Sequence, residues 1–337
     1  MKMKLSWLLL VTVVIVSSIA IVSCKKTIDN LTNNVDNTNS SSAKTQSSDG
    51  SLVNVETSQA DNDVNNTTAA SARMNPNRNG ATGTANGIPS NADTSYSVAY
   101  KTLTINYHGV IPGTCRSRTG SITIQLTSGN NWVDSGSVLL YTFNNYTVTN
   151  SCNGKTIILN GTRTIKNLSG GSLYTIFKSI SGYPSTVKFR FRANYNVSFI
   201  DSGSTVQKNA VWNEAFVTST IYVTGAGYAF SSAGDSTYNG TAFTESWGTT
   251  RNGDNFTTVF AINGNSTPVT SNTFCSYWGI RPTGGSVVYT VAGIPYSVIY
   301  GLDVTGNVST SSTCGILYYR VTWPTIGTAS ASALIPY

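Results

Sequence analysis

The sequence predicts an all-β protein, built as a large antiparallel β-sandwich or a strongly twisted β-meander. After Tyr96, apolar and polar residues alternate with a period of two, which is typical of strands with one buried face. Gly, Asn and Asp separate nearly all of these segments, as antiparallel hairpins require. Charged residues make up only 10% of the 337 residues, too few for a helical bundle or a coiled coil. No segment shows a convincing helical period of 3.6 residues.

The clearest strand is expected over residues 187–199. Val187, Phe189 and Phe191 begin an apolar series at every second position, and Lys188 and Arg190 begin the polar series between them. Such a segment places one face on a core and the other in water. The same reasoning predicts strands over residues 103–107, 121–126, 137–149, 156–166, 173–180, 210–223, 241–247, 257–262, 277–281, 286–291, 297–301 and 316–323.

The first 23 residues have the pattern of a lipoprotein signal peptide. Lys2 and Lys4 form a basic start, an apolar run follows over residues 5–22, and residues 20–24 resemble the bacterial lipobox. The lipobox requires a thiol because diacylglycerol is attached through a thioether before the signal peptide is cleaved. We therefore expect Cys24 to carry the lipid that anchors the chain to a membrane, and residues 1–23 to be removed. An apolar run of this length also fits an uncleaved transmembrane anchor.

The residue after Cys24 bears on which membrane holds the lipid. In enteric bacteria an Asp at that position retains a lipoprotein in the inner membrane, and Lys25 does not match that signal. We expect attachment to the outer membrane of the cell envelope, on either its periplasmic or its surface face.

Residues 24–95 differ in composition from the rest of the chain. Asn, Ser, Thr, Asp, Ala and Gly dominate the segment, and from residue 27 onward it lacks aromatic residues until Tyr96. Such a composition buries too little apolar surface to offset the entropy lost on ordering. We expect a lipidated, disordered linker over residues 24–95 and one all-β domain over residues 96–337.

The positive charge belongs to the expected β domain. Residues 1–95 hold equal numbers of basic and acidic residues, so the formal net charge of +7 comes from the rest of the chain. This excess favours an anionic partner, such as an acidic polysaccharide, or an envelope protein. Basic residues do not cluster as they do in nucleic-acid-binding proteins, so we expect no nucleic acid partner.

Four cysteines remain after Cys24. An even number in an oxidising compartment predicts two disulfides, and pairing between neighbours in the sequence suits a hairpin-rich fold. This pairing joins Cys115 to Cys152 and Cys275 to Cys314. Zinc is the alternative, but the wide spacings contain no CxxC pair. The sequence predicts no metal and no cofactor.

The expected β domain contains two glutamates in similar surroundings. Glu214 lies between Trp212 and Phe216 on one strand face, and Glu245 lies between Phe243 and Trp247. If the two strands pair, the carboxyl groups come together between aromatic walls, as in the catalytic pair of a glycoside hydrolase. The alternative is that both glutamates lie on a solvated face.

The polar face of the strand over residues 187–199 carries Lys188, Arg190 and Arg192. These three residues form a possible surface for an anionic ligand, or else an ordinary solvated strand face. The single histidine, His108, follows a predicted strand. The sequence contains no G-x-S-x-G motif that could supply a serine nucleophile for it, so we expect His108 at the surface.

Several short motifs resemble a family of β-rich lipoproteins of the Bacteroidota. They lie at residues 103–107, 113–115, 118–122, 143–146, 160–165, 248–253, 275–278, 299–301 and 313–315, and Cys24-Lys25-Lys26 looks like the start of such lipoproteins. The sequence departs from the pattern at Ile316, where the family often has Asp. The resemblance implies an exported lipoprotein and no particular mechanism.

Together these observations favour a cell-envelope lipoprotein that acts as a non-catalytic binding or structural module tethered to the outer membrane. The alternative is a glycan-active enzyme, a glycoside hydrolase that uses Glu214 and Glu245.

Overall fold

The described strands form one large antiparallel sheet. The computed structural model describes residues 37–70, 89–97, 101–172, 175–176, 181–182, 184–223, 227–235, 244–260, 269–272, 281–308, 318–325 and 330–336. Its strands are β1 (Ala92–Ser97), β2 (Thr102–Val110), β3 (Arg116–Ser128), β4 (Val138–Asn150), β5 (Lys155–Asn167), β6 (Thr186–Ile200), β7 (Gln207–Val223), β8 (Gly227–Gly234), β9 (Thr244–Thr249), β10 (Asn255–Phe260), β11 (Val269–Asn272), β12 (Arg281–Gly284), β13 (Ser286–Val291), β14 (Ile294–Leu302), β15 (Tyr318–Pro324) and β16 (Ser330–Pro336).

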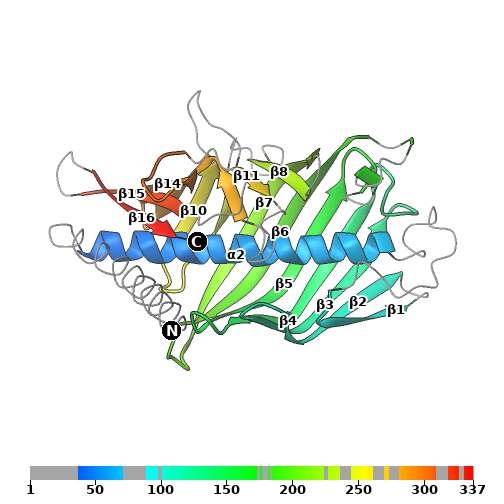
Figure 1. Ribbon diagram of the computed structural model, residues 1–337, viewed down its shortest axis with the longest axis horizontal. Helices are drawn as coiled ribbons and strands as arrows, with labels where there is room; N and C mark the ends of the chain where they lie inside the picture. The colour runs from blue at the N-terminus through cyan, green and yellow to red at the C-terminus, as the bar shows by residue number, and fades with distance from the viewer. Residues whose placement is uncertain are drawn as a thin grey trace, which may run out of the picture.

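Most strands pair with their neighbour in the sequence. The main path runs β1-β2-β3-β4-β5-β6-β7-β9-β10-β13-β14-β15-β16, and β8, β11 and β12 form a branch beside β7. The all-β prediction is confirmed. Of the two predicted architectures, the meander is correct and the sandwich is wrong, because the described strands form one sheet that packs its apolar face on a helix (Figure 1).

The alternation in β6 is as the sequence predicts. Val187, Phe189, Phe191 and Tyr195 are buried, whereas Lys188 is exposed. β7 pairs with every residue of β6, with Trp212 opposite Tyr195. This period-two pattern therefore places one face of the sheet on the core.

The strand predicted over residues 173–180 is not formed at the two positions described there. Thr175 and Ile176 are helical instead. Ser172 begins this turn, because its N–H donates to Thr175 Oγ1 at 2.7 Å and its Oγ accepts from Thr175 N–H at 3.3 Å. This reciprocal pair competes locally with strand formation.

A long helix, α2 (Asn37–Ala70), crosses the sheet over its apolar face (Figure 1). At 1.5 Å per residue its 34 residues span about 51 Å. The prediction of a disordered linker over residues 24–95 is therefore wrong for residues 37–70, which form α2. The first strand, β1, begins at Ala92, within the predicted linker rather than after residue 95. Residues 24–36 and 71–88 of that segment lie outside the described part of the chain.

The helix has a seven-residue repeat of small residues in place of an apolar stripe. Ala43, Gly50, Thr57 and Val64 recur at one heptad position, and Gln46, Val53, Ala60 and Thr67 recur three residues later. All eight are buried. Their polar and small side chains hid the repeat from a search for hydrophobic periodicity.

Gly50 shows how closely α2 approaches the sheet. A Cβ at this position would lie 2.5 Å from the hydroxyl oxygen of Tyr289, a buried residue of β13. Glycine weakens a helix interior, so its presence here is explained by this contact rather than by helix propensity.

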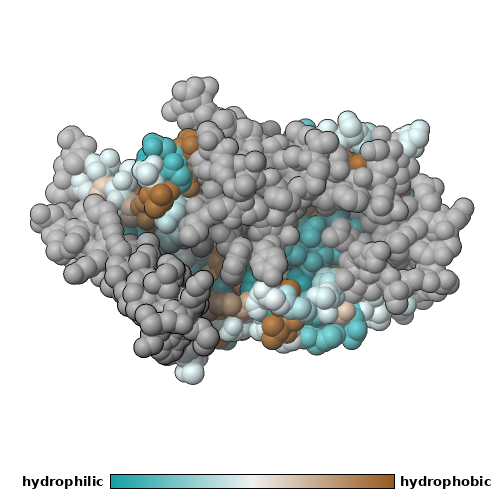
Figure 2. Space-filling view, in the orientation of Figure 1, coloured by the Kyte–Doolittle hydropathy of each residue, from teal (hydrophilic) through white to brown (hydrophobic). Residues whose placement is uncertain are grey.

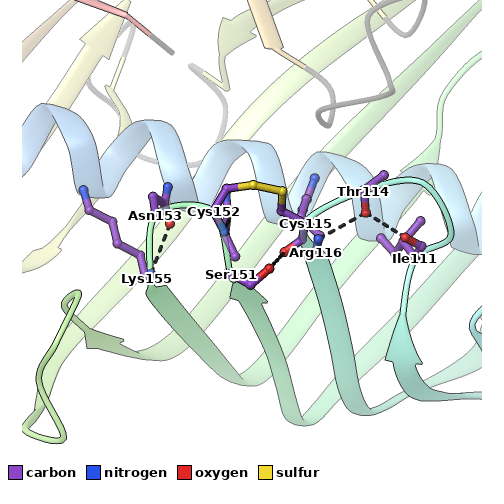
Figure 3. The surroundings of a disulfide bond; sticks show 9 residues. Ile111, Thr114, Cys115, Arg116, Ser151, Cys152, Asn153 and Lys155 are labelled. Atoms are coloured by element: carbon purple, nitrogen blue, oxygen red, sulfur yellow. Dashed lines mark hydrogen bonds between the residues drawn. A yellow bond between two sulfur atoms is a disulfide. The ribbon is translucent and has the colours of Figure 1, made fainter. Parts of the chain in front are cut away.

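One disulfide joins two neighbouring turns of the sheet. Cys115, between β2 and β3, is bonded to Cys152, between β4 and β5, beside α2 (Figure 3). Ser151 N–H and Oγ both donate to the Cys115 carbonyl oxygen, at 2.8 and 3.0 Å. The predicted pairing of Cys115 with Cys152 is confirmed.

The other cysteine predictions cannot be placed. Cys275, Cys314 and the proposed lipid site Cys24 lie outside the described residues, as do residues 1–23. Among the described helices, none has both the length and the hydropathy needed to cross a membrane.

Candidate functional site

Four arginines of the sheet point at α2, and we call them the arginine track. Arg116 and Arg118 come from β3, Arg163 comes from β5, and Arg251 comes from the turn between β9 and β10. The side chains of all four are at most 8% exposed. Buried guanidinium groups need partners, because an isolated charge is costly to remove from water.

Every acidic residue of α2 pairs with the arginine track. Arg116 binds Glu56, and Arg118 binds Asp63. Arg163 lies 2.7 Å from Asp61 Oδ2. Arg251 binds Asp49 through two nitrogens, of which Nε donates to Oδ2 at 2.7 Å. These pairs join α2 to segments as far as 202 residues away in the sequence.

Aromatic rings of the sheet hold the guanidinium groups in place. Arg118 stacks on Tyr107 with its guanidinium carbon 4.6 Å from the ring centre. Arg163 lies 4.6 Å from the ring centre of Phe191, and Arg251 lies 4.4 Å from that of Phe199. Stacking limits the motion of these side chains before any acid binds, so the track is preorganised.

The disulfide adds a covalent constraint at one end of the track. Arg116 directly follows Cys115, and its N–H donates to Thr114 Oγ1 at 3.1 Å (Figure 3). The turn that presents Arg116 to Glu56 is therefore fixed by a hydrogen bond and by the bond to Cys152.

The arginine track surrounds the helix on more than one side. Asp49, Glu56 and Asp63 are seven residues apart and share one face of α2, whereas Asp61 lies roughly 120–160° around the axis. From Ala43 to Thr68, none of the side chains with described burial is exposed. The space-filling view shows hydrophilic residues in a hollow near α2 (Figure 2).

Burial raises the pKa of the helix carboxyl groups. The pKa of Asp49 rises to about 6 and that of Asp61 to about 7, because loss of water outweighs the attraction of Arg251 and Arg163. The pKa of Glu56 is also raised by burial, against the opposing effect of Arg116. The docked helix therefore holds its protons more tightly than the free segment would.

Glu214 and Glu245 lie on neighbouring strands, but they are not directly opposite. β7 pairs with β9 in a register that sets Glu214 across from Ser246. Both glutamates are buried, so the predicted solvated face is wrong, whereas Trp212 and Glu214 do share the buried face. Gly248 allows this pairing, because at φ +156° a Cβ would lie 1.9 Å from the Val211 carbonyl oxygen.

The two glutamates have different electrostatic environments. Glu214 Oε2 accepts from Arg163 Nη1 at 2.6 Å, and the same nitrogen donates to Tyr195 Oη at 2.9 Å. Burial, with a further contribution from the charge of Glu214, raises the pKa of Glu245 to about 8. Glu245 is therefore mostly protonated at neutral pH, whereas the carboxyl groups of Asp61 and Glu214 both contact Arg163.

The basic residues predicted as an anionic-ligand surface are partly neutralised within the chain. Arg190 Nε lies 2.9 Å from Asp235 Oδ2, and Arg192 lies 3.6 Å from the same oxygen. Lys188 is exposed. An external anion at Arg190 and Arg192 would have to compete with the buried carboxylate of Asp235.

Other candidate chemistry is limited in the part of the chain that the structure covers. His108 is exposed and lies 3.1 Å from the exposed Asp93, as expected for a surface residue. Within the same residues no group of three or more His, Cys, Asp or Glu side chains is arranged to hold a metal ion.

Comparisons with known proteins add no family. No protein-family model, no curated protein and no solved structure matches this chain.

The arginine track was missed at the sequence level. Arg116, Arg118 and Arg163 lie in predicted strands or next to them, where they count as ordinary polar positions. The available signal was the seven-residue spacing of Asp49, Glu56 and Asp63 within a segment that is rich in Ser, Thr and Asn.

Proposed function

We propose that this chain is a cell-envelope lipoprotein whose β-sheet binds an anionic partner without chemically changing it. The supporting observation is the arginine track, which places four buried and mostly ring-stacked guanidinium groups along one face of the sheet. Such an arrangement recognises carboxylates by charge and by hydrogen-bond direction together. It contains no nucleophile that a base activates.

The lipid anchor at Cys24 belongs to this proposal, with the outer membrane as its location. If Cys24 is the anchor, residues 25–36 alone separate it from α2. Twelve residues reach at most roughly 43 Å when fully extended. The β-sheet would then work close to the membrane surface, where acidic glycans and other envelope proteins are its available partners.

The test compares two forms of the full chain. In the α2-weakened variant, Asp49→Asn, Glu56→Gln and Asp63→Asn remove three of the four α2 carboxylates that pair with the arginine track. Arg163 and Arg251 keep their further partners Glu214 and Asp201. Both chains are passed over immobilised carboxylated polysaccharides, lipopolysaccharide and envelope protein fractions. We expect the variant to be retained more strongly, and retention to fall with added salt, since ion pairs accessible to water are screened.

Two results would contradict this proposal. One is the absence of retention of either chain on every surface. The other is loss of retention in the triple variant Lys188→Gln, Arg190→Gln and Arg192→Gln, which would locate the contact on the opposite face of β6.

A glycoside hydrolase is the second candidate, and one observation favours it. Glu245 is protonated at neutral pH while the neighbouring Glu214 is paired with Arg163, so an acid and a carboxylate lie near each other. Glycosidases use such a pair. Release of reducing ends from a glycan panel, abolished by Glu214→Gln or Glu245→Gln, would support the enzyme and overturn the binding proposal.

A further inference from the structure

We propose that the arginine track is a receptor for an acidic α-helix of another protein, and that α2 occupies it as an internal competitor. The inference rests on the proposed binding function and adds the chemical class of the partner. The partner would be a helical segment with acidic residues at the spacing of Asp49, Glu56, Asp61 and Asp63.

The spacing of the arginines matches a helix. On α2 the acids bound by Arg251, Arg116 and Arg118 are separated by seven residues, which is about 10.5 Å of axial rise each. Arg163 contacts Asp61 on a different side of the helix axis. A helix presents acids at these positions on two sides at once, whereas an extended chain alternates between opposite faces every 3.3 Å.

The width of the site also matches a helix. Side chains on every side of α2 are at least partly buried between Ala43 and Thr68, and residues of the size of Gly50 and Ala60 lie against the sheet. A helix with small side chains fills this space. A single extended chain is narrower, so it would leave core atoms of the sheet without contacts.

The composition of α2 makes it an exchangeable occupant. More than half of its residues are Ser, Thr or Asn, which are poor helix formers, and Gly50 weakens its interior. Among the α2 residues with described burial, the fully buried apolar side chains are Ala43, Val53, Ala60 and Val64. The docked helix therefore depends on its ion pairs, and buried ion pairs add little net stability once desolvation is counted.

The chain between α2 and β1 is long enough for α2 to move away from the track by more than its own length. Residues 71–91 reach roughly 70 Å when fully extended, which exceeds the length of α2. Because α2 is tethered, its effective concentration at the track is in the millimolar range. A partner helix must therefore bind more tightly than α2 or be locally abundant.

The experiment uses fluorescent peptides and the full chain. One peptide is an alanine-rich helix with Glu at positions i, i+7, i+12 and i+14, and the matched peptide has the same composition with its four Glu residues adjacent. Polyglutamate serves as the extended polyanion. Binding is measured by anisotropy for the wild type, the α2-weakened variant, and a control that carries Asp29→Asn, Asp93→Asn and Asp134→Asn.

We expect the α2-weakened variant to bind the spaced helix at least about tenfold more tightly than the other two probes, a difference of about 1.4 kcal/mol. The wild type and the control should bind it more weakly than the α2-weakened variant does. In case the substitutions prevent folding, a second form keeps the natural acids and carries a protease site within residues 71–88. Once cut, this form should exchange its α2 for the spaced helix.

The failures are distinguishable. Equal binding of the adjacent-Glu peptide or of polyglutamate would overturn recognition of a helix and leave the anion-binding proposal in place. If neither the variant nor the cut form binds the spaced helix, the receptor inference is wrong, and retention on polysaccharide then decides the proposed function separately. A wild-type dimer that exchanges α2 would make a second copy the occupant and overturn the assignment to another protein.

Discussion

At the level of single residues, the protonation of the sheet face that contacts α2 depends on buried carboxyl groups that have no arginine of their own. Arg163 is shared by Asp61 and Glu214, and Glu245 lies near this cluster. A cluster with more carboxyl groups than guanidinium groups retains a proton when water is excluded. Its stability therefore depends on pH, and the dependence can be assigned to one residue by substitution.

Glu245→Gln should flatten the pH dependence of stability. The pKa of Glu245 is about 8 in the folded chain against 4.5 for an ordinary Glu, so the folded state holds a proton that the unfolded state releases above about pH 4.5. The free energy of unfolding then falls as pH rises from 4.5 to 8. The Gln side chain does not ionise, so this loss of stability is absent in the variant. At pH 9 we therefore expect the free energy of unfolding of the variant to exceed that of the wild type, by at most about 5 kcal/mol.

Urea unfolding at pH 5 and pH 9 measures this difference. Glu214→Gln is the matched control, since it leaves Arg163 with less compensation and should destabilise at both pH values, by about 3–5 kcal/mol. Parallel pH profiles for Glu245→Gln and the wild type would show that Glu245 is already ionised in the folded chain.

Gly50→Ala should destabilise the chain although alanine is the better helix former. In an exposed helix the change stabilises by about 0.5–1 kcal/mol. Here the added Cβ would meet Tyr289 Oη, so we expect a loss of about 1–3 kcal/mol. Thermal unfolding measures it, and Tyr289→Phe in the same chain should recover part of the loss. Additive effects of the two substitutions would argue against the contact.

At the level of elements, α2 shows how a segment with weak helix propensity becomes a long helix. Three of its four acidic residues follow a seven-residue spacing, as do the eight buried residues described above, and each set meets the sheet. Isolated helices form poorly without strong helix formers. The helical state of this segment therefore comes from its contacts with the sheet, namely its ion pairs with β3, β5 and the turn between β9 and β10 and its packing on β13 and β15.

The disulfide between two turns should contribute to the same interface. Replacing Cys115 and Cys152 by Ser removes a cross-link over 37 residues, which corresponds to about 4 kcal/mol in the chain-entropy model. We expect a lower urea midpoint and faster hydrogen exchange in α2, because Arg116 is presented by the turn that loses the bond. The double variant Cys275→Ser and Cys314→Ser is the comparison. Unchanged exchange in α2 would separate the disulfide from helix docking.

At the level of the whole molecule, α2 and the described sheet share a single core. The buried residues of α2 belong to the same apolar cluster as those of β2 to β7 and β13 to β15. Docking of α2 also leaves residues 25–36 as the connection to the proposed lipid at Cys24. The same helix would thus set both the occupancy of the arginine track and the distance of the sheet from the membrane.

Cys24→Ala should abolish membrane attachment. Expressed in a bacterial host with lipoprotein processing, the variant is expected to remain an unprocessed precursor or to appear without lipid, because no thiol is available for the thioether. Detergent phase partitioning and mass spectrometry of the mature N-terminus measure this. If processed Cys24→Ala still partitions into detergent, the anchor is at another residue.

By itself the sequence determined most of the strands, the two faces of β6, and the pairing of Cys115 with Cys152. The faces of β6 are a local property, since a period of two assigns each side chain to a face without reference to the rest of the chain. The sequence also placed Trp212 and Glu214 together on one face of a strand, and the structure shows that this face of β7 is buried.

Only the tertiary structure decided that the strands form one sheet, that residues 37–70 are a helix, and that Glu214 is held by Arg163. Each of these depends on partners distant in the sequence, as Asp49 and Arg251 show. A polar segment with no apolar stripe has no sequence pattern from which its helical state could be predicted. Its helical state becomes favourable only when buried arginines, positioned by the completed sheet, require its carboxylates as partners.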